Sequence, residues 1–386
     1  MSIFKYTADE LYSWLTEKSD ILVLDVRNKK DFGRFQVESP YPFAMKNVSY
    51  FDFMEIEEES VALVPKDKPV RIVCAKEGSA KYVAEILEKH GFAEVGYLEG
   101  GIKSWGNLLV PVLLTPQETY RLYQFIRPGK ASCSYGLIYK GEFMVFDPSR
   151  NTDFYLNFAK ENNCKLTRTF ETHLQADYIA GSRILSEKNG AEFFASETDF
   201  AHTKITYTKL QDKADYGFAN GGPSVKCVFT PGHTPGSTSF IINDQYMICG
   251  DTIFIQSVGR PDLGGEVDAW SDFLFETVQQ IKTYSDDLVI LPAHYMSWEE
   301  ANKDLAFIAT LSEIKEYNSD IFSMKDKESF LAFIKGNMRD QPAEYATIRL
   351  INANLEQVDA EKAEELDLGK NECAATAYAA MQEEQS

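Results

Sequence analysis

Histidines placed directly after short apolar segments constrain the fold of this 386-residue chain more than any other feature. His173 follows an alternating segment, 165–171, that is typical of a strand, and precedes a segment with helical periodicity. His233 lies in a Pro-Gly-His-Thr-Pro-Gly turn, and His294 follows another apolar segment. Asp251 occupies a similar place in a Gly-Asp-Thr sequence. Because binding sites of layered α/β folds form where strands end, we expect these four side chains to share a site.

The composition indicates a globular protein with two domains. A chain of 386 residues exceeds one ordinary core, and 44% hydrophobic with 13% aromatic residues is typical of a packed interior. The net charge of −20 argues against a nucleic-acid or anionic-membrane partner. The six cysteines form no close pairs, which argues against a disulfide framework. The first residues lack a basic region before an apolar one, so we expect a cytoplasmic protein without a membrane segment.

Residues 1–110 predict a three-layer α/β domain. Short apolar segments, typical of buried parallel strands, alternate with segments of helical periodicity. The expected strands are 21–26, 70–74 and 95–98, and the expected helices are 6–18 and 80–89. Cys74 ends the second strand, before a tight loop into the next helix. Loop amides and a helix N-terminus lower the pKa of a thiol, so Cys74 is a candidate nucleophile; a buried thiol without chemistry is the alternative.

Motifs in this domain resemble the rhodanese family. They are Leu24-Asp25-Val26-Arg27, the Cys74 loop, and Gly100-Gly101-Ile102-Lys103-Ser104-Trp105. The loop cysteine of that family carries a persulfide during sulfur transfer, so the resemblance implies this role for Cys74. Family loops commonly hold an Arg where this chain has Ser79 and a Gly where it has Glu77. We expect the Glu77 carboxylate to raise the pKa of the thiol.

Residues 111–386 predict two sheets covered by helices, an αββα sandwich. A hairpin around the Lys140-Gly141 turn is expected from 133 to 146. Further strands are expected at 165–171, 192–195, 224–230, 238–242, 246–249 and 288–291. Helices are expected at 152–162, 177–188 and 271–282. Residues 107–116, with two prolines, are expected to be a linker, and the acidic tail from Glu356 to have helical composition.

Residues 115 to about 350 resemble the metallo-β-lactamase superfamily, and within it the persulfide dioxygenase branch. The matching motifs are Thr172-His173-Leu174-Gln175-Ala176-Asp177-Tyr178, the His233 turn, Gly250-Asp251-Thr252-Ile253-Phe254, Gly259-Arg260-Pro261-Asp262 and Pro292-Ala293-His294. The superfamily pattern Thr-His-x-His-x-Asp-His is altered, because Gln175 replaces the second His and Tyr178 the last. A dinuclear zinc hydrolase needs both imidazoles, so we expect no two-zinc hydrolase site.

The resemblance implies one iron ion, held by His173, His233 and Asp251. Two imidazoles and one carboxylate are the ligand set of non-haem Fe(II) oxygenases, which leaves positions for substrate and O₂. The altered motif positions are the ones that this ligand set does not use. We therefore expect one Fe(II) per chain, with zinc as an alternative ion in the purified protein. A decayed site, whose residues remain only as buried polar groups, is the other interpretation.

Other residues near the expected site have less specific roles. Arg260 is a candidate for binding the carboxylate of a thiol carrier, because its planar fork suits carboxylates, and a solvated loop Arg is the alternative. Tyr178 and His294 are expected to contact substrate. Asp177 and Gln175 are expected next to the ligands, with Asp177 either orienting an imidazole or capping a helix.

The leading hypothesis for function is a persulfide dioxygenase-like enzyme. It would oxidise a low-molecular-weight persulfide, of the glutathione or coenzyme A type, with O₂ to sulfite, and Cys74 would act as a sulfurtransferase. Self-association is expected from the resemblance. Two alternatives remain. One is a sulfur carrier whose lactamase-like domain holds no metal, as the changes at Gln175 and Tyr178 suggest. The other is a thioester hydrolase of the glyoxalase II type, which needs a second metal ion.

Overall fold

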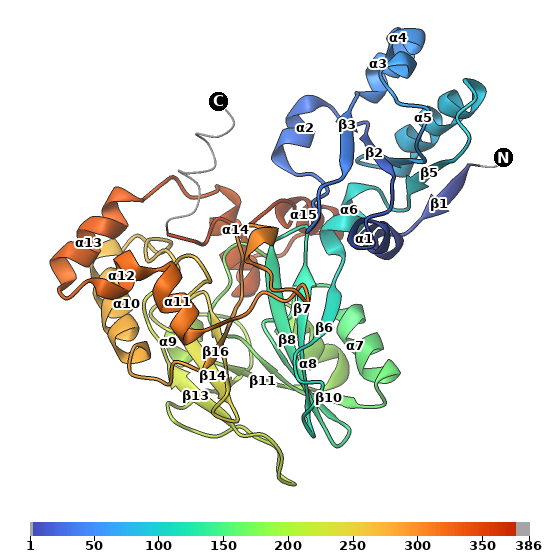
Figure 1. Cartoon of the computed structure of the whole chain (residues 1–386). Coiled ribbons are helices and arrows are strands. Elements are labelled where there is room, and N and C mark those ends of the chain that lie inside the picture. Colours follow the sequence, from blue (N-terminus) through green and yellow to red (C-terminus); the bar gives the residue numbers. More distant parts are fainter. Residues whose placement is uncertain (1–2, 376–386) are drawn as a thin grey trace. The chain divides into compact units, whose positions relative to one another are not determined.

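The computed structural model describes residues 3–375, which form two compact units (Figure 1). The first unit contains residues 3–110, 127–130 and 368–370. The second contains residues 111–126, 131–367 and 371–375. The part of the predicted tail beyond residue 375 lies outside the described residues. Within residues 3–375, no helix combines the length and the apolar character that crossing a membrane requires.

The first unit is built on a five-stranded parallel sheet with the strand order β1-β5-β4-β2-β3. Its strands are β1 (Phe4–Tyr6), β2 (Leu22–Asp25), β3 (Ala44–Asn47), β4 (Val70–Val73) and β5 (Val95–Leu98). Its helices are α1 (Ala8–Thr16), α2 (Lys29–Arg34), α3 (Tyr50–Glu55), α4 (Glu57–Ala62), α5 (Glu77–Lys89) and α6 (Ile102–Asn107). The strands and helices predicted for this region are confirmed, with α5 starting three residues earlier than its apolar pattern indicated.

Local sequence signals account for these elements. Thr7 and Glu10 form a capping box at the start of α1, with the Thr7 side chain accepting from the Glu10 amide. Strands β2 and β4 are buried along their whole length, as expected for parallel strands covered on both faces. Gly91 (φ 84°) follows the end of α5 in the left-handed region that favours glycine.

The second unit contains two sheets. The seven-stranded sheet has the order β12-β11-β10-β9-β8-β7-β6, and the five-stranded sheet has the order β13-β14-β15-β16-β17. The strands of the first are β6 (Val110–Leu113), β7 (Arg121–Arg127), β8 (Ser132–Tyr139), β9 (Glu142–Phe146), β10 (Lys165–Phe170), β11 (Glu192–Ala195) and β12 (Thr208–Lys209). Those of the second are β13 (Val225–Phe229), β14 (Thr238–Ile242), β15 (Tyr246–Gly250), β16 (Val289–Pro292) and β17 (Ala309–Thr310).

Aromatic side chains join the two sheets of this unit. The rings of Phe146 in β9 and Phe170 in β10 stack with centroids 4.8 Å apart, and each lies 5.2 Å from the ring of Phe240 in β14. All three side chains are buried. The sheets therefore pack face to face over an apolar core, and the αββα sandwich is confirmed.

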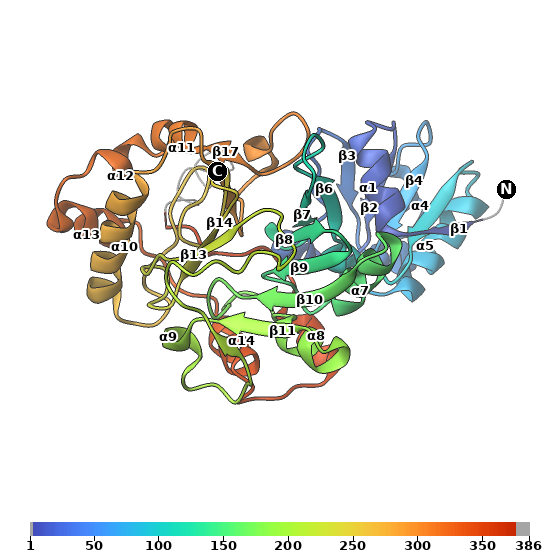
Figure 2. The ribbon, with the colours of Figure 1, turned by 90° about the horizontal axis from the view of Figure 1, so that it is seen from below.

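Helices cover the outer sides of the sandwich (Figure 2). They are α7 (Thr152–Glu161), α8 (Ser182–Asn189), α9 (Glu197–Phe200), α10 (Val267–Ile281), a 3₁₀ turn (Trp298–Glu300), α11 (Leu311–Tyr317), α12 (Ser319–Ser323), α13 (Lys327–Gly336), α14 (Glu344–Asn352) and α15 (Ala360–Leu366). Helices α7 and α8 lie against β10, and α10 packs against α13 on the other side.

Two predicted elements differ from the structure. Residues 107–116, expected to be a linker, contain strand β6. The helix expected from residue 177 begins only at Ser182, because distant side chains accept the preceding amides. The Ile179 amide donates to Asp367 Oδ1 at 3.1 Å, and the Ala180 amide donates to Asn352 Oδ1 at 2.9 Å. Residues 172–181 therefore form an irregular loop, which carries the central motif.

Candidate metal centre

His173 follows β10 and is buried. Its Nδ1 atom lies 2.9 Å from Thr172 Oγ1, and the Thr172 hydroxyl donates to Asp147 Oδ2 at 2.8 Å. Because the single hydroxyl proton goes to Asp147, Thr172 accepts from Nδ1–H of His173. The Nε2 atom of His173 then carries a lone pair, which is the state that a metal ligand requires. Burial lowers the pKa of His173 to about 3, so the imidazole is neutral.

His233 follows β13 in its Pro-Gly-His turn and is also buried. Its Nδ1 atom lies 2.9 Å from the carbonyl oxygen of Arg260. A carbonyl only accepts, so Nδ1 carries the proton and Nε2 presents a lone pair. The rings of His173 and His233 are perpendicular, with centroids 4.9 Å apart. Two imidazole Nε2 atoms are thus fixed in the same tautomer on one side of the site.

Asp251 supplies the carboxylate, directly after β15. Its Oδ2 atom lies 3.8 Å from His173 Nε2 and 3.4 Å from His233 Nε2. Gly250 (φ 54°) precedes it, and a Cβ there would overlap the side chain of Thr172. Burial alone would raise the pKa of Asp251, but neighbouring imidazoles, His294 foremost, hold it well below its usual value. The carboxylate is therefore ionised.

These three residues fit a metal ion. One ligand atom from each of His173, His233 and Asp251 lies within 4.8 Å of the others, and all three side chains are buried. Among the described residues, His173 Nε2 and Asp251 Oδ2 have no hydrogen-bond partner. Buried polar atoms without partners are costly unless a ligand or ion satisfies them. Two imidazoles and a carboxylate form the set typical of non-haem iron, although zinc accepts the same donors.

A second group of donors lies beside the first. Ligand atoms of Asp177, His294 and Cys373 also lie within 4.8 Å of one another, and all three residues are buried. His294 Nε2 lies 3.0 Å from Asp177 Oδ2, and His294 Nδ1 lies 2.7 Å from Asp251 Oδ1. Burial alone would lower the pKa of His294, yet Asp177 and Asp251 raise it to about 10. Asp251 thus contacts both groups, one oxygen toward each.

The structure decides between the interpretations of Asp177. It lies four residues before the N-cap position of α8, Gly181, and so does not cap that helix. Its carboxylate faces His294 instead. The predicted role of orienting an imidazole fits this contact. His294, expected near the substrate, lies between two carboxylates.

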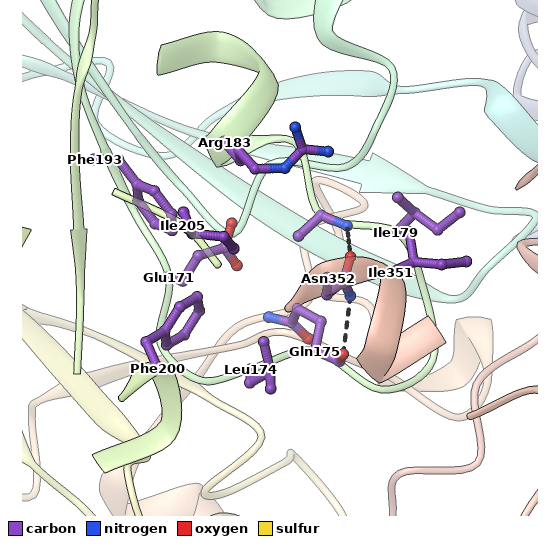
Figure 3. A pocket seen from close by; sticks show the side chains of 11 residues that line it. Glu171, Leu174, Gln175, Ile179, Arg183, Phe193, Phe200, Ile205, Ile351 and Asn352 are labelled. Carbon is purple, nitrogen blue, oxygen red and sulfur yellow. Dashed lines mark hydrogen bonds between the residues drawn. The ribbon is translucent and has the colours of Figure 1, made fainter. Parts of the chain in front are cut away.

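Tyr178 and Gln175 replace the two missing histidines, and the structure places them differently. The Tyr178 hydroxyl donates to the Asp147 carbonyl at 3.2 Å, and its ring lies edge-on to His294 with centroids 6.2 Å apart. Gln175 lines a cavity with Glu171 (Figure 3). The backbone carbonyl of Gln175 accepts from the Asn352 side chain at 2.9 Å. That cavity, of about 20 Å³, has room for a water molecule and excludes a substrate.

The interpretation of Arg260 as a substrate-binding residue needs correction. Arg260 is buried, and its guanidinium pairs with both oxygens of Asp262, from Nε and Nη2 at 2.7 Å each. The remaining guanidinium contacts are to the carbonyls of Arg339 and Glu372. Because Asp262 and two backbone carbonyls already accept from the guanidinium group, Arg260 is not available to bind a substrate carboxylate. Arg260 instead holds the loop whose carbonyl orients His233.

A cavity of about 210 Å³ reaches His233 and identifies residues that the motifs missed. Its lining includes Trp270 from α10 and Arg349 from α14. Burial lowers the pKa of Arg349, and its guanidinium donates to the Leu263 carbonyl. The apolar ring and the cation suit a thiol carrier with a carboxylate. Both residues lie outside any recognisable motif, so sequence patterns do not identify them.

Asp199 is a second residue that the motifs missed. Its Oδ2 atom accepts from the Leu174 amide at 3.0 Å and from the Thr234 hydroxyl at 2.7 Å, and its Oδ1 atom accepts from the Gly236 amide at 2.7 Å. Leu174 follows His173, and Thr234 follows His233. One half-buried carboxylate from α9 therefore connects the two histidine loops.

Cys74 lies in the first unit, between β4 and α5, and is buried. Burial raises the pKa of the Cys74 thiol, against hydrogen bonds from the Lys76 and Ala75 amides and the Ser79 side chain that lower it. Glu77 is not its partner: the carboxylate lies 2.8 Å from Lys5 Nζ and accepts from the Gly100 amide at 2.9 Å. The expectation that Glu77 raises the pKa is corrected, because burial is the main cause.

The Gly-Gly motif of the first unit has a steric reason. Gly101 (φ 65°) lies against the Cys74 loop, where a Cβ would be 2.6 Å from the Cys74 carbonyl oxygen and 2.8 Å from that of Ala75. The Ile102 amide donates to the Cys74 carbonyl at 2.7 Å. The motif therefore fixes the backbone of the loop that carries the thiol.

Comparison with known families agrees with this architecture. Residues 7–108 match the rhodanese-like domain, and residues 128–307 match the metallo-beta-lactamase superfamily. The chain is a rhodanese-like domain fused to a domain of the metallo-β-lactamase superfamily, as its motifs predicted.

The relatives of the second domain are named for two kinds of activity, hydrolase and dioxygenase. A hydroxyacylglutathione hydrolase of Francisella philomiragia is 29% identical over 165 residues, which are 42% of this chain and 62% of that protein. The human mitochondrial persulfide dioxygenase ETHE1 is 31% identical over 138 residues, 35% of this chain and 51% of that protein.

Solved structures are similar to the same part of the chain. A metallo-beta-lactamase from Staphylococcus aureus is 26% identical, with a TM-score of 0.55 over 61% of this chain and 73% of that one. ETHE1 from Myxococcus xanthus, 20% identical, has a TM-score of 0.51 over 60% of this chain and 98% of that one. The second comparison concerns the fold alone.

Proposed function

We propose that this protein is a persulfide dioxygenase-like enzyme that oxidises a low-molecular-weight thiol persulfide to sulfite. The observation that carries the proposal is the group of His173, His233 and Asp251, in which both Nε2 atoms lie near one carboxylate oxygen. The likeness to ETHE1 supports it. The overall reaction is RSSH + O₂ + H₂O → RSH + SO₃²⁻ + 2H⁺.

One Fe(II) ion, held by these three residues, supplies the redox chemistry with O₂. The chain's own residues supply position. Thr172 and the Arg260 carbonyl fix the tautomers of the two imidazoles. The cavity beside His233 binds the carrier, with Trp270 against its apolar part and Arg349 near its carboxylate. The carboxylate contact suits a glutathione persulfide, whereas a coenzyme A persulfide would present a phosphate to Arg349 instead.

The rhodanese-like domain adds sulfur transfer at Cys74. The thiolate attacks the outer sulfur of a persulfide, so Cys74–S⁻ + RS–SH gives Cys74–S–SH + RS⁻. The S–S bond of the substrate breaks as that of the enzyme forms, and the thiolate of the carrier leaves. The amides of Lys76 and Ala75 hydrogen-bond to the sulfur and favour its anion. We propose a cytoplasmic, self-associating enzyme that exchanges sulfur in this way.

A thioester hydrolase is the second candidate, and one observation favours it. Asp177, His294 and Cys373 provide a further donor group despite the loss of the last motif histidine at Tyr178. Hydroxyacylglutathione hydrolases are among the relatives. Two adjacent ions would suit hydrolysis, because they activate water and stabilise developing charge together.

Metal analysis of anaerobically purified protein, followed by oxygen uptake, tests the proposal. We expect close to one iron per chain, lost in His173→Ala and kept in the matched control His202→Ala, whose side chain is exposed. The iron-loaded protein should consume O₂ with glutathione persulfide or coenzyme A persulfide and release sulfite. Iron-loaded protein that consumes no O₂ but cleaves a hydroxyacylglutathione would establish the hydrolase instead. No metal after anaerobic loading would leave sulfur transfer at Cys74.

A further inference from the structure

We propose that Asp177, His294 and Cys373 form a second metal-ion site, selective for a thiophilic divalent ion of the zinc type, with the Cys373 thiolate as a ligand. This goes beyond the proposed function, which requires only the first group of donors. It also revises the expectation that the substitution at Tyr178 removes the second site. A sulfur ligand from the C-terminal segment would take the part of the absent imidazole.

The three side chains lie close together in the interior of the second unit. Their ligand atoms lie within 4.8 Å of one another, and their exposed fractions are 0% for Asp177 and 1% for both His294 and Cys373. They come from three distant parts of the chain: the loop after β10, the end of β16, and the segment after α15. Convergence of carboxylate, imidazole and thiol at one buried point is the arrangement expected of a structural or catalytic metal site.

The donor set indicates the class of ion. Oxygen-only sites select magnesium, calcium or manganese, whereas a thiolate selects softer ions. Zinc accepts sulfur, nitrogen and carboxylate oxygen together in tetrahedral geometry. Asp251 places Oδ1 2.7 Å from His294 Nδ1, so the first group adjoins the second. On binding, the ion forms bonds to the three ligands, and the thiol proton of Cys373 passes to solvent.

Cys373 is held in place by its backbone. The Arg260 amide donates to the Cys373 carbonyl at 2.8 Å, and the Ala375 amide donates to the Val258 carbonyl at 2.8 Å. Gly259 and Ala374 form an antiparallel bridge between these two bonds. An isolated bridge and two flanking backbone hydrogen bonds therefore join the segment to the Gly-Arg-Pro-Asp loop and give Cys373 a defined position.

Side chains fasten the same segment. Asn371 donates to the Ala131 carbonyl at 3.0 Å, and the Glu372 amide donates to the Tyr345 hydroxyl at 2.7 Å. Arg339 donates to the Ala374 carbonyl at 2.8 Å. Cys373 itself packs in an apolar cluster, whose members are Ala176, Phe254, Leu263, Tyr345 and Ala374. A thiol packed in this way would need no polar neighbours, yet it faces Asp177 and His294.

Cobalt substitution provides the test, because Co(II) bound to a thiolate shows a charge-transfer band in the near ultraviolet. We expect the wild-type protein to bind two Co(II) or zinc ions per chain and to show the band. Cys373→Ser should retain one ion and lose the band. The matched control Cys164→Ser, whose thiol donates only to the Ala159 carbonyl, should retain both. His173→Ala should lose the first ion and keep the band.

A second variant, Cys373→His, distinguishes loss of the metal ligand from loss of folding. It restores an imidazole, so it should bind two ions without the band. One ion per chain in the wild type with no band, or an unchanged band in Cys373→Ser, would overturn the second site. Oxygen uptake by the iron-loaded protein tests the first group separately, so failure of one proposal is distinguishable from failure of the other.

Discussion

The imidazole of His173 and the hydroxyl of Thr172 are neighbours in sequence and partners in structure, with Nδ1 2.9 Å from Oγ1. The hydroxyl donates its own hydrogen bond to Asp147 Oδ2. A residue directly before the ligand thus determines which nitrogen of that ligand is available to a metal ion. The threonine of the motif therefore serves as the hydrogen-bond acceptor that fixes the tautomer of His173.

Thr172→Val should weaken metal binding at the first group roughly 10- to 100-fold, because the ligand loses the acceptor that fixes its tautomer. Competition with a chromophoric chelator measures the change. Thr167→Val is the matched control, since the Thr167 hydroxyl donates only to the Phe143 carbonyl. Equal affinities for the two variants would show that the hydrogen bond does not tune the ligand.

Arg260→Ala should lower the free energy of unfolding by about 3–5 kcal/mol, because it leaves Asp262 as a buried charge without its partner. Urea denaturation measures the loss. The remaining activity of the variant should show an unchanged KM for the thiol carrier, because the Arg260 guanidinium pairs with Asp262 and not with substrate. A raised KM in a variant of unchanged stability would restore Arg260 as a substrate-binding residue.

Arg349→Leu should raise KM for a carboxylate-bearing carrier about tenfold while kcat changes less, because the side chain lines the cavity beside His233. Steady-state kinetics separate the two constants. Arg121→Leu serves as the control, because Arg121, on β7, donates to Asn162 at the end of α7 and does not line the cavity. A fall in kcat alone would indicate that Arg349 positions the bound substrate for reaction and does not contribute to its binding.

His294 gives the metal-free protein a specific dependence on pH. Its pKa rises from 6.5 to about 10 on folding, so its contribution to stability is complete below about pH 6.5 and is lost as the pH rises through about 10. The urea midpoint of chelator-treated protein should therefore fall across that interval. His294→Gln should remove this part of the slope, and His202→Gln should keep it. Identical slopes in both variants would contradict the assignment.

Cys74 should react more slowly below pH 9 than a thiol activated as a thiolate, because burial raises its pKa above 9.0. Alkylation followed by peptide mass spectrometry gives the pH profile. Glu77→Gln should leave this profile nearly unchanged, since the carboxylate faces Lys5. Cys74→Ser should abolish sulfur transfer. Full reactivity near pH 6 would mean that the loop amides outweigh burial.

Much of this architecture can be predicted from local patterns. The hairpin of β8 and β9, the strands before His173 and Asp251, and the capping box of α1 all follow from residues close together in sequence. The first donor group was also expected, because each member ends a strand. Local signals were sufficient wherever a residue's neighbours in sequence determine its position.

Local patterns do not predict the structure where contacts between segments distant in sequence determine it. The loop after β10 remains irregular because Asp367 and Asn352, far along the chain, accept its amides. Arg260 has the sequence context of a ligand-binding residue, but Asp262 occupies its guanidinium. No local pattern marks Cys373 as a candidate ligand, because only the folded chain brings it to His294.

The pairing of the Cys373 segment with the loop at Gly259 has a consequence for biosynthesis. A ribosome releases Asp177 and His294 well before it has translated Cys373. The second set of donors is therefore incomplete on a nascent chain, even when the sandwich around it has folded. Acquisition of an ion there would report that translation has proceeded through Cys373, and a polypeptide truncated before it would lack that mark.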